Sequence, residues 1–239
     1  MMNNFNIDIL AFGAHPDDVE CAAAGVIIRT IKKGGSVVLV DLTKGEMGSY
    51  GTVEIRKEEA FTAAQLMGVK IREQLNLPDG KISNTLQNQQ KVIQLIRKYK
   101  PKIVLANAFN DKHPDHRNAA ELVADACFIS GLKMNVTRLN EKEQEHWRPM
   151  AVYHYIQDYF IQPSFVVDIS DCFTAKMDAI KAYKSQFVIP ENESPNGIIA
   201  LLDQIKATNQ IFGRAINKRY AEGFITNRYV GVENIESLI

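Results

Sequence analysis

The sequence predicts an α/β protein with a Rossmann-like, doubly wound, mostly parallel sheet, helices on both faces and a C-terminal elaboration of strands and helices. Two observations predict this fold. Over the first two-thirds of the 239 residues, apolar strand-like runs alternate with helical patterns. This order is typical of right-handed crossover units and of a parallel sheet that is covered on both faces. From about Ala151 the order changes to two strand-like runs followed by two helical stretches.

The alternation assigns the elements of the first part in order. The apolar runs IDILAFG, SVVLVDLT and KIVLANA predict strands at residues 7–13, 36–43 and 102–108. The intervening helical patterns predict helices at 17–35, 52–69, 84–100 and 116–130. Since consecutive strands of such a fold are joined by helices, the carboxyl ends of the strands are expected at one edge of the sheet.

The last third of the chain reads differently. The runs AVYHYI and SFVVDI predict strands at 151–156 and 164–169, and helices are expected around 173–187 and 197–221. No linker rich in proline, glycine or serine separates this part from the first. We therefore expect one domain over residues 1–239, with a Rossmann-like core at 1–150 and an elaboration of that same domain at 151–239.

Composition excludes several classes of protein. The chain has 28 Lys and Arg against 28 Asp and Glu and shows no basic run, which argues against a nucleic-acid partner. Its three cysteines are far apart and lack CxxC spacing, so neither a disulfide framework nor a thiolate zinc site is expected. No apolar run is long enough to cross a bilayer and the start does not resemble a signal peptide. We expect a cytoplasmic protein without a membrane partner.

The first chemical candidate is the cluster His15-Pro16-Asp17-Asp18, at the end of the first predicted strand. Pro16 suits the first turn of a helix, because its missing N–H would have no partner there. The helix dipole would stabilise each aspartate of that turn by roughly 0.3–1 kcal/mol. On its own, this cluster is best interpreted as a capped helix start.

The second cluster is NDKHPDHRN, which follows the predicted strand at 102–108 and holds His113, Asp115 and His116. Two imidazoles and one carboxylate around an open position are a ligand set of catalytic zinc, which lowers the pKa of bound water from 15.7 to about 7. Adjacent residues of a helix point about 100° apart, so one aspartate of the first cluster can bind metal while its neighbour takes a proton. The spacing alone does not assign these roles.

The pair of motifs AHPDDVE and HPDH resembles the LmbE-like or PIG-L-like family of zinc-dependent N-deacetylases. The stretches GTVEIRKEEA, DKHPDHRNAAELV, AYKSQF and YAEGF are similar to those of the family's bacillithiol-pathway members, which deacetylate N-acetylglucosaminyl malate. The resemblance spans nearly the whole chain. It implies hydrolysis of the N-acetyl group of an N-acetylglucosamine conjugate by attack of zinc-bound water, and a homo-oligomeric protein.

The resemblance also implies roles for individual residues. It implies one Zn²⁺ per subunit, held by His15, Asp18 and His116; Fe²⁺ or Co²⁺ could occupy the same kind of site. It implies that Asp17 is the general base and that His113 stabilises the oxyanion or protonates the leaving amine.

Two further implications concern the surroundings of these residues. Asp115 would orient His113. Some family members carry a carbonyl-polarising Tyr two residues before this histidine, where this chain has Asp111. The similarity places Arg56 at the substrate pocket, where its planar fork suits a carboxylate or sugar hydroxyls. Lys112 is a second candidate for an anionic substrate group.

The sequence leaves three alternative functions. One is a deacetylase of another N-acetylated amino sugar. Another is a Rossmann-type nucleotide-binding protein without hydrolytic chemistry, but GAHPDD places carboxylates where a pyrophosphate needs glycines and N–H donors. The third is a metal-dependent phosphoesterase, which usually needs two metals and more ligands than the sequence offers.

Overall fold

The computed structural model describes residues 6–188 and 198–238. Its main sheet has seven strands in the order β3-β2-β1-β4-β7-β9-β8. The strands, in that order, are Ile71–Gln74, Val37–Asp41, Ile9–Gly13, Ile103–Asn107, Ala151–Tyr155, Ala221–Ile225 and Phe165–Asp168. The pairs from β3 to β7 are parallel, and β9 runs antiparallel to both β7 and β8. The predicted fold, a mostly parallel sheet within an α/β protein, is confirmed.

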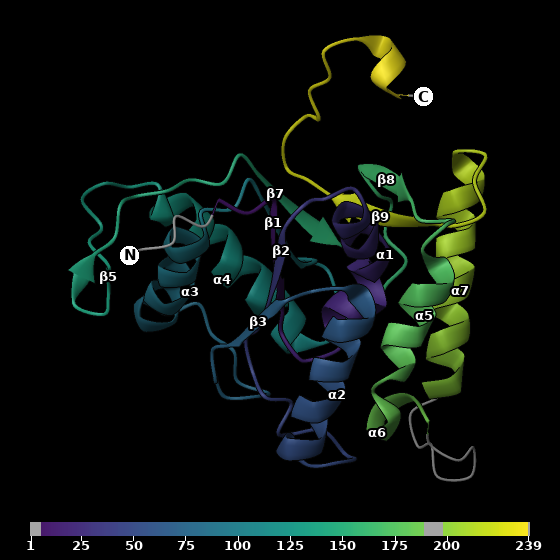
Figure 1. Cartoon of the computed structure of the whole chain (residues 1–239), viewed down its shortest axis with the longest axis horizontal. Helices are drawn as coiled ribbons and strands as arrows, with labels where there is room; N and C mark the ends of the chain where they lie inside the picture. Colours follow the sequence, from purple (N-terminus) through teal and green to yellow (C-terminus); the bar gives the residue numbers. More distant parts are fainter. Residues whose placement is uncertain (1–5, 189–197, 239) are drawn as a thin grey trace.

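Helices cover both faces of this sheet (Figure 1). The helices are α1 Asp18–Lys32, α2 Val53–Met67, α3 Leu86–Tyr99, α4 Pro114–Ser130, α5 Phe173–Lys181, α6 Lys184–Phe187 and α7 Ile198–Ala215. A short hairpin, β5 Arg138–Leu139 and β6 Lys142–Glu143, and a 3₁₀ turn η2, Ile235–Leu238, complete the described elements. Among the described helices, none combines the length and apolar character needed to span a membrane.

The alternation of side chains along the strands builds one core on each face. In β1, Leu10 and Phe12 face α3 and α4, while Ile9 and Ala11 face α1. Both sets are buried because successive strand residues point to opposite faces. The central strands can therefore be apolar throughout, which is why the sequence reads as continuous apolar runs there.

Local signals explain where several helices begin and end. The Thr52 and Thr85 side chains accept hydrogen bonds from the N–H groups of Ile55 and Asn88, capping α2 and α3. Pro114 is the first residue of α4, two residues before the start predicted at 116. Helix α1, in contrast, begins only at Asp18, so the expectation that Pro16 lies in its first turn is wrong.

The structure differs from the prediction at one strand and two helices. Strand β3 has no predicted counterpart. The helix expected at 173–187 divides into α5 and α6. The helix expected at 197–221 ends at Ala215, because the chain turns through Asn217 at φ 56° and continues as β9.

Candidate active site

The two His-Pro-Asp clusters meet at the carboxyl ends of the neighbouring strands β1 and β4. His15 follows β1, and His113 and His116 begin α4 after β4. The ring centroid of His15 lies 4.7 Å from that of His113 and 5.4 Å from that of His116, and the latter two centroids are 4.9 Å apart. The predicted convergence at one sheet edge is therefore present.

Asp18, the first residue of α1, lies between two of these imidazoles. One carboxylate oxygen, Oδ1, is 3.1 Å from Nε2 of His116, and the other, Oδ2, is 3.6 Å from Nδ1 of His15. Asn107 and Gln157 donate side-chain hydrogen bonds to Oδ2 and Oδ1, at 3.1 and 2.9 Å. Burial raises the pKa of Asp18, but the facing imidazoles outweigh it and hold the pKa well below its ordinary value.

Each of the two imidazoles has a carboxylate at both ring nitrogens. His15 Nε2 lies 3.0 Å from Asp79 Oδ1, and His116 Nδ1 lies 2.9 Å from Asp111 Oδ1, in addition to the contacts with Asp18. Burial lowers the pKa of His116, yet Asp18 and Asp111 together raise it to about 10. The pKa of His15 is raised well above its usual value by carboxylates in the same way.

This arrangement fits a divalent cation. Without one, both rings have to stay doubly protonated to satisfy their carboxylates, whereas a cation can take the place of a proton on each ring. Carboxylates that hold the outer nitrogens of ligating histidines are typical of protein metal sites. His15 and His116, with Asp18 between them, remain the predicted metal ligands, and Asp79 and Asp111 lie at the opposite nitrogens of the two rings.

Among the described residues, two groups of three satisfy the spacing of a metal site; both include His15, and neither includes Asp18. They are His15 with His113 and His116, and His15 with Asp79 and Asp115. In the second group, both Asp115 oxygens already accept N–H groups from residues 80 and 82, and Asp79 Oδ2 accepts the N–H of residue 47. These two carboxylates are thus fixed beside His15 by the loop that carries residues 79–82.

Asp17 immediately precedes α1, makes no side-chain capping hydrogen bond to it, and lies beside Arg56. Its Oδ2 is 3.0 Å from Nη1 of Arg56, and the same Nη1 donates to the Pro16 carbonyl at 2.8 Å. Burial raises the pKa of Asp17 to about 7, against the opposing charge of Arg56. Such a carboxylate can take up and release a proton near neutral pH.

Arg56 itself is only 6% exposed. It lies beside Asp17, and its Nη1 contacts are with the protein; its role in substrate binding stays a prediction.

His113 is held as a neutral hydrogen-bond donor. Its Nδ1 accepts the backbone N–H of Asp115 at 3.2 Å, so the proton of the neutral ring lies on Nε2. Burial, with the charges of His15 and His116, lowers the pKa of His113. Asp115 was expected to orient this ring. Its backbone N–H contacts the ring, whereas its carboxylate lies 3.4 Å from His15 Nε2; the role stays a prediction.

Lys112 is exposed next to these residues. Three contributors to the site, Asp79, Asn107 and Gln157, were not anticipated. Asp79 lies in LPDG, a pattern typical of a turn, and carries no chemical signal of its own. Asn107 ends β4 and Gln157 follows β7, so the rule that sites form at the carboxyl ends of parallel strands could have singled them out.

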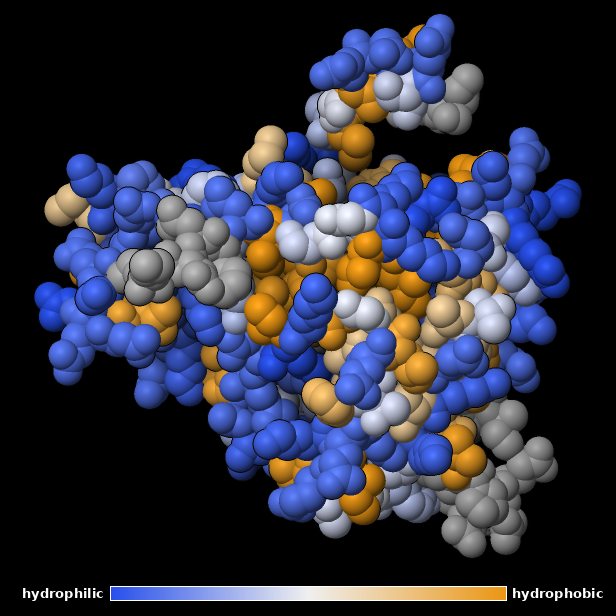
Figure 2. Space-filling model, viewed as in Figure 1, coloured by the Kyte–Doolittle hydropathy of each residue, from blue (hydrophilic) through white to orange (hydrophobic). Residues whose placement is uncertain are grey.

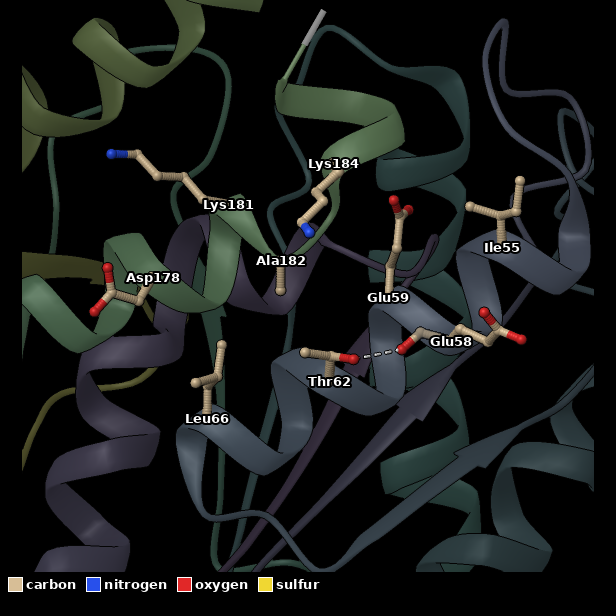
Figure 3. A pocket seen from close by; sticks show the side chains of 9 residues that line it. All are labelled: Ile55, Glu58, Glu59, Thr62, Leu66, Asp178, Lys181, Ala182 and Lys184. Carbon is tan, nitrogen blue, oxygen red and sulfur yellow. Dashed lines mark hydrogen bonds between the residues drawn. The ribbon is translucent and has the colours of Figure 1, made fainter.

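A separate hollow of about 530 Å³ lies between α2 and the α5–α6 region (Figure 3). Its lining includes carboxylates of Glu58, Glu59 and Asp178 and the lysines Lys181 and Lys184. None of the predicted site residues lines it. The two His-Pro-Asp clusters therefore lie outside this hollow.

The fold and the site define an α/β protein with a histidine and carboxylate centre of the metal-binding type. The family model described as "PIG-L: GlcNAc-PI de-N-acetylase" matches residues 10–127, which include both clusters. A diacetylchitobiose deacetylase of Thermococcus kodakarensis is 30% identical over 227 residues, covering 90% of this chain and 81% of the relative. The chain belongs to the PIG-L family of de-N-acetylases, as the resemblance implied.

Two further similarities agree with this assignment. A probable N-acetyl-alpha-D-glucosaminyl L-malate deacetylase 2 of Bacillus cereus is 27% identical over 195 residues, covering 74% of this chain and 83% of the relative. The crystal structure of a conserved protein, TT1542, from Thermus thermophilus superposes with a TM-score of 0.84 at 32% identity, covering 95% of this chain and 98% of that one. The family resemblance thus extends through the C-terminal third.

Proposed function

We propose that this chain is a metal-dependent hydrolase, using zinc, that removes the N-acetyl group from a small N-acetylglucosamine conjugate. The observation that carries the proposal is the enclosure of the Asp18 carboxylate by His15 and His116, with Asp17 next to it at a pKa of about 7. Membership of the de-N-acetylase family supports the reaction class.

The roles of the residues follow from their contacts. His15, Asp18 and His116 would hold the metal, which when bound supplies an activated water and polarises the acetyl carbonyl. Asp17 accepts the proton of the attacking water and, with its pKa near 7, passes that proton on to the departing amine. His113 donates its Nε2–H to the oxyanion as the carbonyl becomes tetrahedral.

The first substrate that we propose is N-acetylglucosaminyl malate. The sequence stretches shared with the bacillithiol-pathway deacetylases and the Bacillus cereus relative support it. Lys112, exposed beside His113, is suited to pair with a malate carboxylate, whereas Arg56 already contacts Asp17. The alternative within the class is another N-acetylated amino sugar, which the Thermococcus relative supports.

A nucleotide-binding function is disfavoured by the same geometry. Asp17 and Asp18 occupy the start of α1, where a pyrophosphate would meet two carboxylates instead of free N–H groups.

The test is an assay of free amine with three substrates, N-acetylglucosaminyl malate, diacetylchitobiose and N-acetylglucosamine, each with added Zn²⁺ and with a chelator. We expect metal-dependent release, with the highest kcat/KM for the malate conjugate. Release of amine from none of the three would refute the deacetylase. A higher kcat/KM for diacetylchitobiose would refute the malate assignment while keeping the reaction class.

The role of Asp17 has its own test. Asp17→Asn should lower kcat by about 10²–10⁴-fold, because the general base is lost. Its metal content, measured by elemental analysis, should stay that of the unaltered protein, since Asp17 is not among the proposed ligands. Full activity of this variant would show that the base has been assigned wrongly.

A further inference from the structure

A groove of about 320 Å³ lies between α4, β7 and the segment 226–228 that follows β9. Strand β9 pairs with β7 only at His154 and Tyr155, so before His154 the edge of β7 that faces away from β4 has no strand beside it in the described chain. Figure 2 shows the end of the described chain apart from the main surface, so that end does not fill the groove. None of the residues proposed for the active site lines the groove, which is therefore a separate place for a ligand.

Two arginines lie at one end of the groove, and its described lining contains no Asp or Glu. Arg148 Nη2 donates to the Phe128 carbonyl and Arg228 Nη1 to the Met150 carbonyl, both at 2.8 Å. Within the part of the chain that the structure describes, neither guanidinium forms an ion pair with a carboxylate. Since a guanidinium has five N–H donors, both groups keep donors for an anion. This end of the groove thus carries two positive charges without a compensating carboxylate.

His154 lines the other end of the groove, four residues after Met150. It is 3% exposed, its ring centroid lies 4.3 Å from that of Phe109, and its Nδ1 lies 2.7 Å from the Asn107 carbonyl oxygen. A carbonyl only accepts, so Nδ1 carries the proton, and burial lowers the pKa of the ring, which keeps it neutral near pH 7. Nε2 is then an acceptor, and no described group donates a hydrogen bond to it.

The lining between these two ends is largely apolar. It includes the side chains of Cys127, Phe128, Met150 and Val152. Phe128 and Met150 are 60% and 70% exposed, so they remain open to a ligand. At about 3.3 Å per residue, the ends marked by Met150 and His154 lie roughly 13 Å apart along the strand. The groove therefore has a cationic end, an apolar middle and a neutral hydrogen-bond acceptor.

We propose that this groove binds a small organic acid with an apolar body and a terminal hydroxyl group. The carboxylate of the acid pairs with Arg148 and Arg228, and its hydroxyl donates to Nε2 of His154. The planar guanidinium matches the geometry of a carboxylate, and such charge-assisted hydrogen bonds are about twice as strong as neutral ones. The apolar body of the acid covers Phe128 and Val152, which supplies the remaining affinity.

The experiment titrates the full chain, loaded with Zn²⁺, with para-hydroxyhydrocinnamate and measures binding by calorimetry. Two further probes isolate the groups of this acid: its neutral amide lacks the carboxylate, and hydrocinnamate lacks the hydroxyl. The groove variants are Arg148→Gln and Arg228→Gln. Arg138→Gln is the matched control, because Arg138 is exposed on β5 and does not line the groove. Circular dichroism and Tm show that each variant is folded.

We expect one molecule of para-hydroxyhydrocinnamate per chain, with the amide and each groove variant weakening binding about tenfold or more, since hydrogen bonds to charged groups contribute about 1.5–3 kcal/mol. The control variant should bind as tightly as the unaltered protein. If the acid shows no saturable binding at millimolar concentration, or if the groove variants bind it as tightly as the control, the proposal is overturned. Binding of the acid at the metal centre alone would give this second result.

The hydroxyl contact with His154 is tested by His154→Phe. In the unaltered protein para-hydroxyhydrocinnamate should bind more tightly than hydrocinnamate, and in this variant the two acids should bind equally, at unchanged effect of Arg148→Gln. A preference for the hydroxyl that survives His154→Phe would overturn the assignment of His154.

The position of the ligand is tested by photolabelling with para-azidohydrocinnamate, in which the azide replaces the hydroxyl. We expect the label on peptides that contain residues 124–128, 148–154 or 226–228. A label confined to the two His-Pro-Asp clusters or to any other surface would overturn the groove as the binding site, as would a groove that stays unlabelled because another chain covers it.

Discussion

Replacement of Asp111 tests whether the carboxylates around the histidines serve a metal. Asp111 is 1% exposed, and its Oδ1 accepts hydrogen bonds from His116 Nδ1 at 2.9 Å and from the His113 N–H at 3.0 Å. Its Oδ2 faces the Asp158 N–H at 3.4 Å. Asp111 therefore fixes the ring of one proposed ligand and the backbone at the start of α4, without being a ligand itself.

The size of the effect follows from what each substitution leaves behind. Asp111→Asn keeps the shape and one acceptor oxygen but loses the negative charge that strengthens the bond to the ring. Asp111→Ala loses the acceptor altogether. Since groups that hold ligating histidines are worth 10–100-fold in metal affinity, we expect about a tenfold loss for Asn and about a hundredfold loss for Ala. These losses correspond to about 1.4 and 2.8 kcal/mol.

Metal affinity is measured directly, by competition of Zn²⁺ with a chromophoric chelator and by the visible spectrum of the Co²⁺ protein. Asp158→Asn is the control, because it changes the neighbouring carboxyl while keeping the N–H that Asp111 accepts. If both Asp111 variants bind metal as tightly as the unaltered protein at unchanged Tm, the assignment of His116 as a ligand oriented by Asp111 is refuted.

Three further predictions concern the base, the core and the metal. Arg56→Gln removes the cation that lowers the pKa of Asp17, so the pKa of that carboxyl should rise. The acid limb of the pH profile of kcat should then move to higher pH. An acid limb at unchanged pH would contradict the pairing of Arg56 with Asp17. Glu222→Ala should lower the free energy of unfolding, measured in urea, by about 3–5 kcal/mol, because it leaves the buried Lys176 charge without its partner at 2.7 Å. A loss below about 1 kcal/mol would show that the ion pair is dispensable. A chelator should lower the Tm and added Zn²⁺ should restore it. A ligand that binds only the folded state stabilises that state by about 4 kcal/mol when its concentration is a thousand times Kd. A Tm that the chelator does not change would argue against a metal site.

The sequence predicts the central sheet well because both faces of its strands are buried, so β1, β2 and β4 are continuous apolar runs. The prediction from sequence fails at the edge strand β3. Strand β3 reads IREQ, and its Arg72 lies beneath the sheet edge in ion pairs with Glu20 and Asp41, at 2.5 and 2.7 Å. A strand whose side chains satisfy buried charges has no apolar pattern from which to predict it.

Strand β9 was missed for a related reason. Its sequence, AEGFI, holds Glu222, whose Oε1 and Oε2 accept the N–H groups of residues 25 and 26 of α1. It also holds Gly223, where an added Cβ would lie 2.6 Å from the ring of Phe212. Both residues are poor strand formers, and their presence depends on α1 and α7, which approach β9 only in the folded chain.

The same distinction applies to the site. His15, His113 and His116 were predictable because each follows a strand or opens a helix, where local sequence is informative. Asp79 was not, because it reaches His15 from the loop after β3, far along the chain, by a contact that only the parallel order of β1, β2 and β3 creates.

The conformation of Asp17 gives the neighbouring carboxylates of the first cluster their different tasks. Asp17 has φ 117°, a left-handed backbone conformation that costs a non-glycine residue about 1–3 kcal/mol. With helical backbone angles, Asp17 would be part of the first turn of α1. In the left-handed conformation its carboxylate contacts Arg56, while the carboxylate of Asp18 faces the imidazoles. Arg56 contacts this turn from α2, since its Nη1 lies 3.0 Å from Asp17 Oδ2 and donates to the Pro16 carbonyl at 2.8 Å. Backbone strain maintained by its surroundings is typical of functional positions, and here it separates a carboxylate that faces two imidazoles from one that can exchange a proton.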